Sequence, residues 1–143
     1  MSGYFITGTD TGVGKTIVTA CLAALFRKNG TNVGVMKPLE TGVDPFGQRI
    51  SDAEFLLRAS DASDTLSEVS PYRFKTPAAP YPASQMENRV VEQEVILKSF
   101  RQLAARHDLM LVEGIGGLLV PITRDYLVAD LVRDLQLPLI VVS

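Results

Sequence analysis

The chain has 143 residues and a formal net charge of −2, with 46% apolar and 21% charged residues. This composition is typical of a globular protein and excludes a disordered or fibrous one. The charge balance and the lack of a Lys/Arg cluster exclude nucleic acid and an anionic membrane surface as expected partners.

The cysteine content and the first residues indicate a cytoplasmic protein. Cys21 is the only cysteine, so no disulfide can form within the chain, which is typical of a reducing compartment. The opening residues MSGYFITG lack the basic and apolar regions of a signal peptide. The longest apolar run, residues 17–26, is too short to cross a bilayer.

Short apolar segments typical of strands alternate with helical patterns along the chain. Strands are expected at residues 4–7 and 32–36 and in the segments DLMLVEG and QLPLIVVS, and a short extended piece in GGLLVPIT. The last segment is expected to be a buried parallel strand. Because ligand groups often follow such strands, we expect the sequence to be a piece of a longer chain that lacks C-terminal strands and helices.

The helical patterns differ in strength. After the first strand, an apolar stripe predicts a helix that buries Cys21 and ends near Gly30. Ser51 and Glu54 form a capping-box pattern, which predicts a short helix over residues 52–59. The longest pattern covers residues 88–107. A last helix is marked by Val128, Leu131, Val132 and Leu135.

Residues 71–82 contain four of the eight prolines. Proline lacks an N–H group and disrupts helix interiors and central strands. We therefore expect this segment to be a loop, with its aromatic residues used for packing.

The alternation of strands and helices predicts an α/β protein with three layers, α/β/α, around a mostly parallel sheet. We expect one domain over residues 1–143. Right-handed crossovers bring the loops after residues 7, 36, 112 and 142 to one edge of the sheet. Ligands bind at this edge in open α/β sheets.

The segment GTDTGVGKT, residues 8–16, connects the first strand to the first helix. Strand, glycine-rich turn, Lys-Thr and helix form the pattern of a phosphate-binding loop, whose N–H groups surround phosphates. Lys15 is expected to reach the β- and γ-phosphates and Thr16 to bind Mg²⁺. The fold is therefore expected to be P-loop NTPase-like. Five residues, one more than usual, separate Gly8 from the Gly-Lys pair.

Three further residues are expected near this loop. Lys37 ends the second strand, and is either a solvated loop residue or an anion ligand, with Thr41 close behind it. Asp52 in the first helical turn either complements the helix dipole or binds metal. Glu113 ends a buried strand, where a carboxylate that holds Mg²⁺ is expected in phosphoryl-transfer enzymes.

The glycines after Glu113 permit close approach of the backbone to a ligand, or form a tight turn. The predicted ATP- and phosphate-binding residues are Asp10, Thr11, Gly12, Val13, Gly14, Lys15, Thr16, Glu113, Gly114, Gly116 and Gly117. We expect His107, near a helix C-terminus, to interact with the helix dipole instead of performing chemistry.

The segments GTDTGVGKT, KPLETG, SDA, PYRF and VEGIGGLLVPI resemble, in this order and over the whole chain, those of the dethiobiotin synthetase family. The longer phosphate loop is shared with that family, whose members are some tens of residues longer than this chain. The resemblance implies an ATP-dependent cyclo-ligase of biotin synthesis, and homodimers in which the partner subunit completes the diamine site.

The resemblance also implies a reaction and roles for residues. An amine of 7,8-diaminopelargonate captures CO₂ as a carbamate, the carbamate oxygen attacks the γ-phosphoryl group of ATP, and the second amine closes the ring, giving dethiobiotin, ADP and phosphate. The implied Mg²⁺ ligands are Thr16, Asp52 and Glu113. The implied catalytic residues are Lys15 and Lys37, and the implied substrate contacts are Thr11, Lys37 and Thr41.

Three other functions remain possible from the sequence. An ATP-driven switch or positioning ATPase has a similar loop but carries an early lysine where this chain has Asp10. An amidoligase of corrin synthesis would need a downstream glutaminase domain. A nucleotide-binding domain with a regulatory role in a larger protein is the third alternative.

Overall fold

A computed structural model describes residues 2–143. Its centre is a four-stranded sheet in the order β2-β5-β1-β8, in which every neighbouring pair is parallel. The expected parallel α/β arrangement is therefore confirmed, and the carboxyl ends of the strands lie at one edge. The strands are β1 (Ser2–Gly8), β2 (Val33–Met36), β5 (Leu109–Glu113) and β8 (Leu139–Val142).

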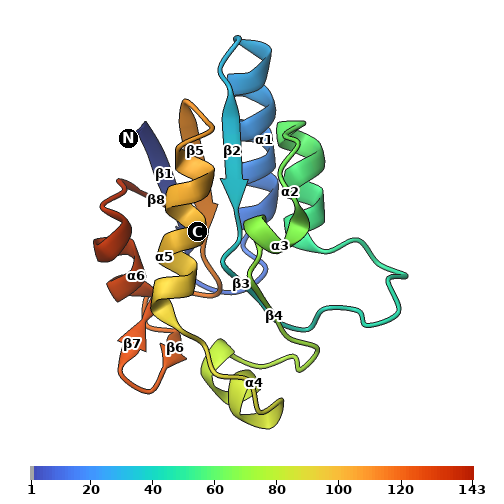
Figure 1. Cartoon of the computed structure of the whole chain (residues 1–143), viewed down its shortest axis with the longest axis vertical. Coiled ribbons are helices and arrows are strands. Elements are labelled where there is room, and N and C mark those ends of the chain that lie inside the picture. Colours follow the sequence, from blue (N-terminus) through green and yellow to red (C-terminus); the bar gives the residue numbers. More distant parts are fainter. Residues whose placement is uncertain (1) are drawn as a thin grey trace.

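Helices cover both faces of this sheet, as Figure 1 shows. The first two helices pack against each other on one face, and α5 contacts β2 and β5 on the other, with α3 and α6 beside it. These are the three layers that the sequence predicted. The helices are α1 (Lys15–Lys28), α2 (Asp52–Ser60), α3 (Leu66–Val69), α4 (Pro80–Met86), α5 (Gln93–Ala104) and α6 (Val128–Leu135).

Two small sheets lie beyond the carboxyl edge. Strands β3 (Leu39–Glu40) and β4 (Tyr72–Arg73) pair in parallel. Strands β6 (Pro121–Thr123) and β7 (Tyr126–Leu127) form an antiparallel pair. The expected extended piece in GGLLVPIT is β6, with Pro121 at its first residue, where a proline is tolerated.

The proline segment 71–82 is more regular than predicted. It contains β4, and α4 begins at Pro80, in the first helical turn. A proline is accommodated there because the N–H groups of the first turn have no partner within the helix. The prediction of a loop throughout this segment was therefore wrong.

Helix α5 is shorter than the sequence pattern that predicted it. We predicted residues 88–107, whereas α5 covers Gln93–Ala104. Asn88 has a positive φ of 50° and follows the end of α4. This left-handed conformation is incompatible with a right-handed helix that passes through Asn88, and α5 begins only at Gln93.

Helix α1 buries a different face from the one predicted. Its buried residues are Lys15, Thr19, Ala20 and Ala23, whereas Cys21 is exposed. Small side chains on the buried face allow the helix to approach the sheet closely. Because apolar residues surround much of this helix, periodicity alone could not select the buried face.

Strand β8 is also less buried than expected. It pairs with β1 and lies at the edge of the described sheet. Val141 is 60% exposed and Leu139 is 37% exposed. Within residues 2–143, β8 therefore has a pairing strand on one side only, which accounts for the exposure of Val141 and Leu139.

The capping box of α2 is confirmed. The Ser51 hydroxyl accepts the Glu54 N–H at 3.3 Å, and the Glu54 carboxylate accepts the Ser51 N–H at 2.8 Å. These two bonds satisfy two N–H groups that the first turn leaves without a helical partner. The cap therefore determines where α2 begins, and with it the position of Asp52.

Replacing Ser51 with alanine is expected to lower the free energy of unfolding by about 1 kcal/mol, because the side-chain acceptor for the Glu54 N–H is lost. Urea denaturation followed by circular dichroism measures this change. Ser67→Ala, at an exposed position in α3, is the control. An unchanged denaturation midpoint for Ser51→Ala would contradict the structural role of the cap.

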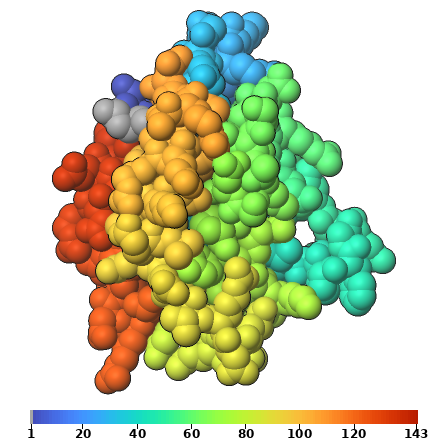
Figure 2. All heavy atoms as spheres, in the orientation of Figure 1, coloured from blue at the N-terminus to red at the C-terminus, as the bar shows by residue number. Residues whose placement is uncertain are grey.

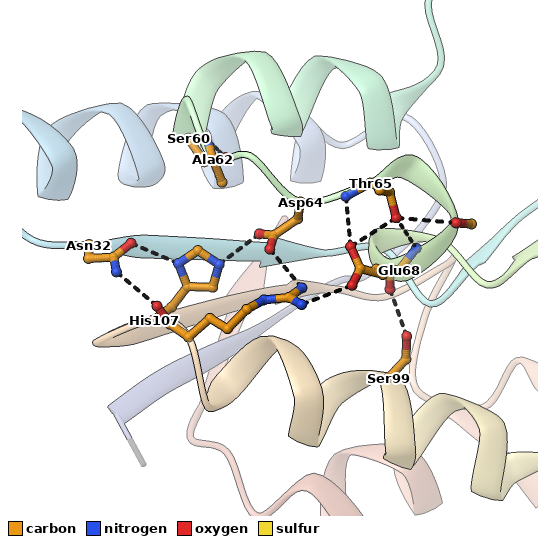
Figure 3. A network of polar contacts seen from close by, with 10 residues as sticks. Asn32, Ser60, Ala62, Asp64, Thr65, Glu68, Ser99 and His107 are labelled. Carbon is orange, nitrogen blue, oxygen red and sulfur yellow. Dashed lines mark hydrogen bonds and ion pairs between the residues drawn. The ribbon is translucent and has the colours of Figure 1, made fainter.

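A polar network lies at the amino-terminal end of the strands, opposite the carboxyl edge. It joins the α2–α3 connection to the residues that follow α5 (Figure 3). His107 lies between the Asn32 amide oxygen, 2.8 Å from Nδ1, and the Asp64 carboxylate, 2.7 Å from Nε2. Arg106 donates to Asp64 and Glu68. His107 therefore links separate segments, which corrects the expectation that it interacts with the dipole of its own helix.

Candidate nucleotide site

The glycine-rich loop, Lys37 and Glu113 meet because of the strand register. Met36 of β2 pairs with Val112 of β5, so Lys37 and Glu113 leave adjacent strands at the same level. Ile6 of β1 pairs with Glu113 itself, two residues before the loop begins. Parallel pairing thus brings together residues that are about 30 to 100 positions apart in the chain.

The loop conformation depends on glycine at two positions. Gly12 has φ 76° and Gly14 has φ 106°. Side chains with a Cβ rarely adopt these values. Gly14 is the N-cap residue of α1, and its carbonyl accepts the Val18 N–H at 3.0 Å. The turn therefore directs the N-terminus of a 14-residue helix towards the cavity described below.

Lys37 and Glu113 form a buried ion pair. The Lys37 Nζ lies 2.8 Å from the Glu113 Oε1, and it also donates to the Gly114 carbonyl at 3.1 Å. The two side chains are 5% and 1% exposed. Removal of either partner from a buried pair of this kind leaves the other as an uncompensated buried charge.

Thr16 and Asp52 complete this group. The Thr16 hydroxyl donates to the Glu113 Oε1 at 2.7 Å, and the Asp52 Oδ2 lies 3.6 Å from the Lys37 Nζ. The second oxygen of Glu113, Oε2, is buried and has no hydrogen-bond partner among residues 2–143. The Glu113 and Asp52 carboxylates and the Thr16 hydroxyl thus lie close to one another, and the Glu113 Oε2 atom has no partner in the described part of the chain.

Lys15 lies at the start of α1 with its ammonium group held inside the loop. Its Nζ donates to the Asp10 carbonyl at 2.9 Å. Burial, and then the positive charge of Lys37, lower the pKa of the Lys15 ammonium group. Two cations placed this close together favour binding of an anion between them.

A cavity of about 710 Å³ lies over these side chains. This volume lies within the range of known small-molecule sites. Of the predicted site residues, Thr11, Gly12, Gly14, Lys15, Thr16, Lys37, Thr41, Asp52, Glu113 and Gly116 line the cavity. Asp10, Val13, Gly114 and Gly117 are not among its lining residues; Asp10 and Gly114 contact the two lysines through backbone carbonyls.

Sequence reasoning missed several lining residues. Glu40 stands three positions after Lys37, and Ile17, Ile115 and Val120 are apolar neighbours of predicted residues. The segment 77–79 of the proline-rich stretch also lines the cavity. The acidic residue in KPLETG was the one available signal for Glu40, whereas nothing in the sequence connects residues 77–79 with the loop.

A projecting segment borders the site. Residues 43–50 protrude from the side of the molecule in Figure 2. The Asp44 carboxylate organises them by accepting the N–H groups of Phe46, Gln48 and Arg49. The first of these bonds contributes most to lowering the pKa of the Asp44 carboxyl group. A smaller cavity here shares Glu40, Thr41 and Asp52 with the main one.

A parallel α/β sheet whose first strand leads through a glycine-rich turn and a Lys-Thr pair into a helix defines the class of P-loop nucleotide-binding domains. The chain belongs to the AAA domain family, whose model matches residues 2–143. No helix of residues 2–143 combines the length and apolar character needed to cross a membrane.

Curated relatives share one name, ATP-dependent dethiobiotin synthetase BioD. The protein from Bacillus subtilis (strain 168) is 41% identical over 143 residues, and that from Anaeromyxobacter sp. (strain Fw109-5) is 48% identical over 143 residues. The protein from Nitrosopumilus maritimus (strain SCM1) is 38% identical over 144 residues. The alignments cover 100% of this chain but only 62%, 63% and 63% of these relatives.

Proposed function

We propose that this protein is an ATP- and Mg²⁺-dependent dethiobiotin synthetase, which converts 7,8-diaminopelargonate and CO₂ to dethiobiotin with release of ADP and phosphate. The observation that carries the proposal is the meeting of Lys15, Lys37 and Glu113 in one cavity at the phosphate loop. The shared name of the relatives supports the substrate class.

The two lysines would bind and orient the anions of the reaction. Lys15, in the loop, would contact the β- and γ-phosphates of ATP. Lys37, which follows β2, would contact the γ-phosphate and the carbamate oxygen that attacks it. Phosphoryl transfer depends mainly on positioning and on neutralising charge. Two fixed cations, one at the start of α1 and one after β2, would provide both.

Mg²⁺ fits the oxygen donors of this site. Among residues 2–143 there is no cluster of three or more His, Cys, Asp and Glu side chains suited to a metal. Mg²⁺, however, is usually bound by one or two carboxylates, with water and phosphate oxygens as further ligands. Thr16, Asp52 and Glu113 would hold it, and the unpartnered Glu113 Oε2 is an available ligand atom. When bound, the ion would neutralise charge on the phosphates.

Other residues would hold the diamine. The hydroxyls of Thr11 and Thr41 line the cavity and can hydrogen-bond to an amine or a carbamate. Ile115 and the segment 77–79 provide apolar surface for a hydrocarbon chain. Holding both amines next to the reacting carbon favours ring closure by proximity.

The alternatives differ from the proposal at specific residues. In the switch or positioning ATPases the early loop residue is a lysine, whereas here Asp10 uses its side chain to accept the Thr11 N–H at 2.7 Å. This hydrogen bond connects two residues of the loop, and Asp10 has no positive charge that could bind a nucleotide phosphate.

Homodimer formation and a cytoplasmic location remain predictions, which size-exclusion chromatography and cell fractionation test.

ADP release by the full-length protein with bicarbonate and MgATP is expected to depend on 7,8-diaminopelargonate. A coupled ADP assay measures the rate with and without the diamine, and mass spectrometry identifies the product. A monoamine analogue that forms a carbamate but lacks the second amine is the control, since it cannot close the ring. ADP release that ignores the diamine would favour the switch function instead.

A further inference from the structure

Glu40 is a buried carboxylate at the edge of the nucleotide site. It ends β3, is 5% exposed, and lines both the main cavity and the smaller one beside it. A carboxylate is seldom buried to this extent unless it is paired and hydrogen-bonded. Its partners therefore indicate what it does.

Both carboxylate oxygens of Glu40 are engaged by protein groups. The Oε1 accepts the backbone N–H of Ala53 at 3.2 Å, and the Oε2 accepts from Arg73 Nε at 3.3 Å. The parallel register of β3 and β4 places Glu40 and Arg73 opposite each other. Because these contacts occupy both oxygens, Glu40 is better suited to holding the protein than to contacting substrate.

The hydrogen bond from the Ala53 N–H to Glu40 also restricts the position of Asp52, the preceding residue. Asp52 is the first residue of α2, and Ala53, the second, is completely buried. The Asp52 carboxylate is about half exposed, and its only ion pair among residues 2–143 is with Lys37 at 3.6 Å. The direction of this side chain is therefore set mainly by the backbone of the first helical turn, which Glu40 ties to β3.

Lys37 and Glu40 belong to one short segment, in which the Lys37 N–H donates to the Val69 carbonyl and the Phe74 N–H donates to the Glu40 carbonyl. A bond from Glu40 to α2 thus links the segment that carries Lys37 directly to the helix that carries Asp52. Breaking that bond would leave the capping box intact but free the start of α2 to move relative to Lys37.

We propose that Glu40 is a positioning residue, which holds the N-terminus of α2 so that Asp52 faces Lys37 and Glu113 at the metal end of the site. This inference rests on the proposed binding of MgATP in the cavity. Partners of metal ligands that fix ligand orientation affect metal affinity by ~10–100-fold in other proteins.

The test is a Mg²⁺ titration of the binding of a fluorescent ATP analogue to full-length protein. Glu40→Met, which removes both acceptors, is expected to raise the Mg²⁺ concentration for half-maximal binding by ~10-fold. Glu40→Gln is expected to stay within about threefold of the unchanged protein, because its amide oxygen still accepts the Ala53 N–H. Should Glu40→Met fail to fold, Glu40→Asp, with a side chain too short to reach Ala53, replaces it with the same expectation.

Glu68→Met is the matched control. Glu68 also accepts a backbone N–H at the start of a helix, from Thr65, and pairs with an arginine, but it does not line the cavity. The Glu68→Met protein is expected to be less stable but to need the same Mg²⁺ concentration for half-maximal binding. If both variants raise the Mg²⁺ requirement equally, Glu40 contributes general stability only, and the proposal is overturned.

A double-mutant cycle with Asp52→Asn identifies the route of the effect. If Glu40 acts through Asp52, Glu40→Met is expected to add less than twofold to the Mg²⁺ requirement of Asp52→Asn, because linked residues are not additive. Additive effects would overturn the inference. These binding measurements do not use the diamine, so loss of diamine dependence in the ADP assay would refute the reaction without affecting this result.

Discussion

Replacing Lys37 with methionine is expected to reduce turnover by at least ~100-fold, because in the proposed reaction it removes a fixed cation that would face the developing charge of the transferring phosphoryl group. Methionine retains much of the length of lysine without its charge. Steady-state ADP release with saturating diamine and MgATP measures the effect. Lys98→Met, at an exposed position on α5, is the control. Turnover near that of the unchanged protein would refute the role of Lys37.

The same change is expected to reduce stability, because Glu113 is left buried without its cation. Removing one partner of a buried ion pair costs roughly 3–5 kcal/mol. Lys37→Met/Glu113→Gln, which removes both charges, is expected to recover most of the lost stability while remaining inactive. Denaturation midpoints and turnover of the single and double variants therefore separate folding from chemistry. Recovery of activity in the double variant would mean that Lys37→Met acts only through stability.

Replacing Thr16 with valine is expected to raise the Mg²⁺ concentration needed for ATP binding by at least ~10-fold. Valine matches the shape of threonine but lacks the hydroxyl, which here donates to the Glu113 Oε1 at 2.7 Å and is the proposed metal ligand. Isothermal titration of ATP at several Mg²⁺ concentrations measures the change.

Thr19→Val is the control for Thr16→Val. Thr19 lies one turn further along α1 and donates to the Lys15 carbonyl at 2.7 Å, away from the lining of the cavity. Its replacement is expected to leave the Mg²⁺ requirement unchanged. An unchanged requirement in Thr16→Val would count against the assignment of the loop as a MgATP site.

Local rules were sufficient for several features. The pattern of Ser51 and Glu54 identified the start of α2, since a capping box involves residues within one helical turn. The glycine-rich turn between a strand and a helix identified the phosphate loop for the same reason. Lys37 and Glu113 were found because apolar strands end at these residues, and the ends of parallel strands meet.

Other features depended on contacts between distant segments. The buried face of α1 and the exposure of Cys21 are consequences of packing, which periodicity does not specify when apolar residues surround much of a helix. The helix predicted over residues 88–107 could not begin at Asn88, which has a left-handed conformation, and α5 covers only Gln93–Ala104.

By itself, the sequence determined the order of the four strands of the central sheet along the chain, the phosphate loop and the convergence of strand ends, because these depend on short-range patterns and on the parallel topology. Only the tertiary structure decided that Lys37 pairs with Glu113 while one oxygen of Glu113 stays free. It likewise decided that Glu40 ties β3 to α2. Side-chain contacts of this kind depend on distances of a few tenths of an ångström between residues far apart in the chain, and such distances are set only when the core packs.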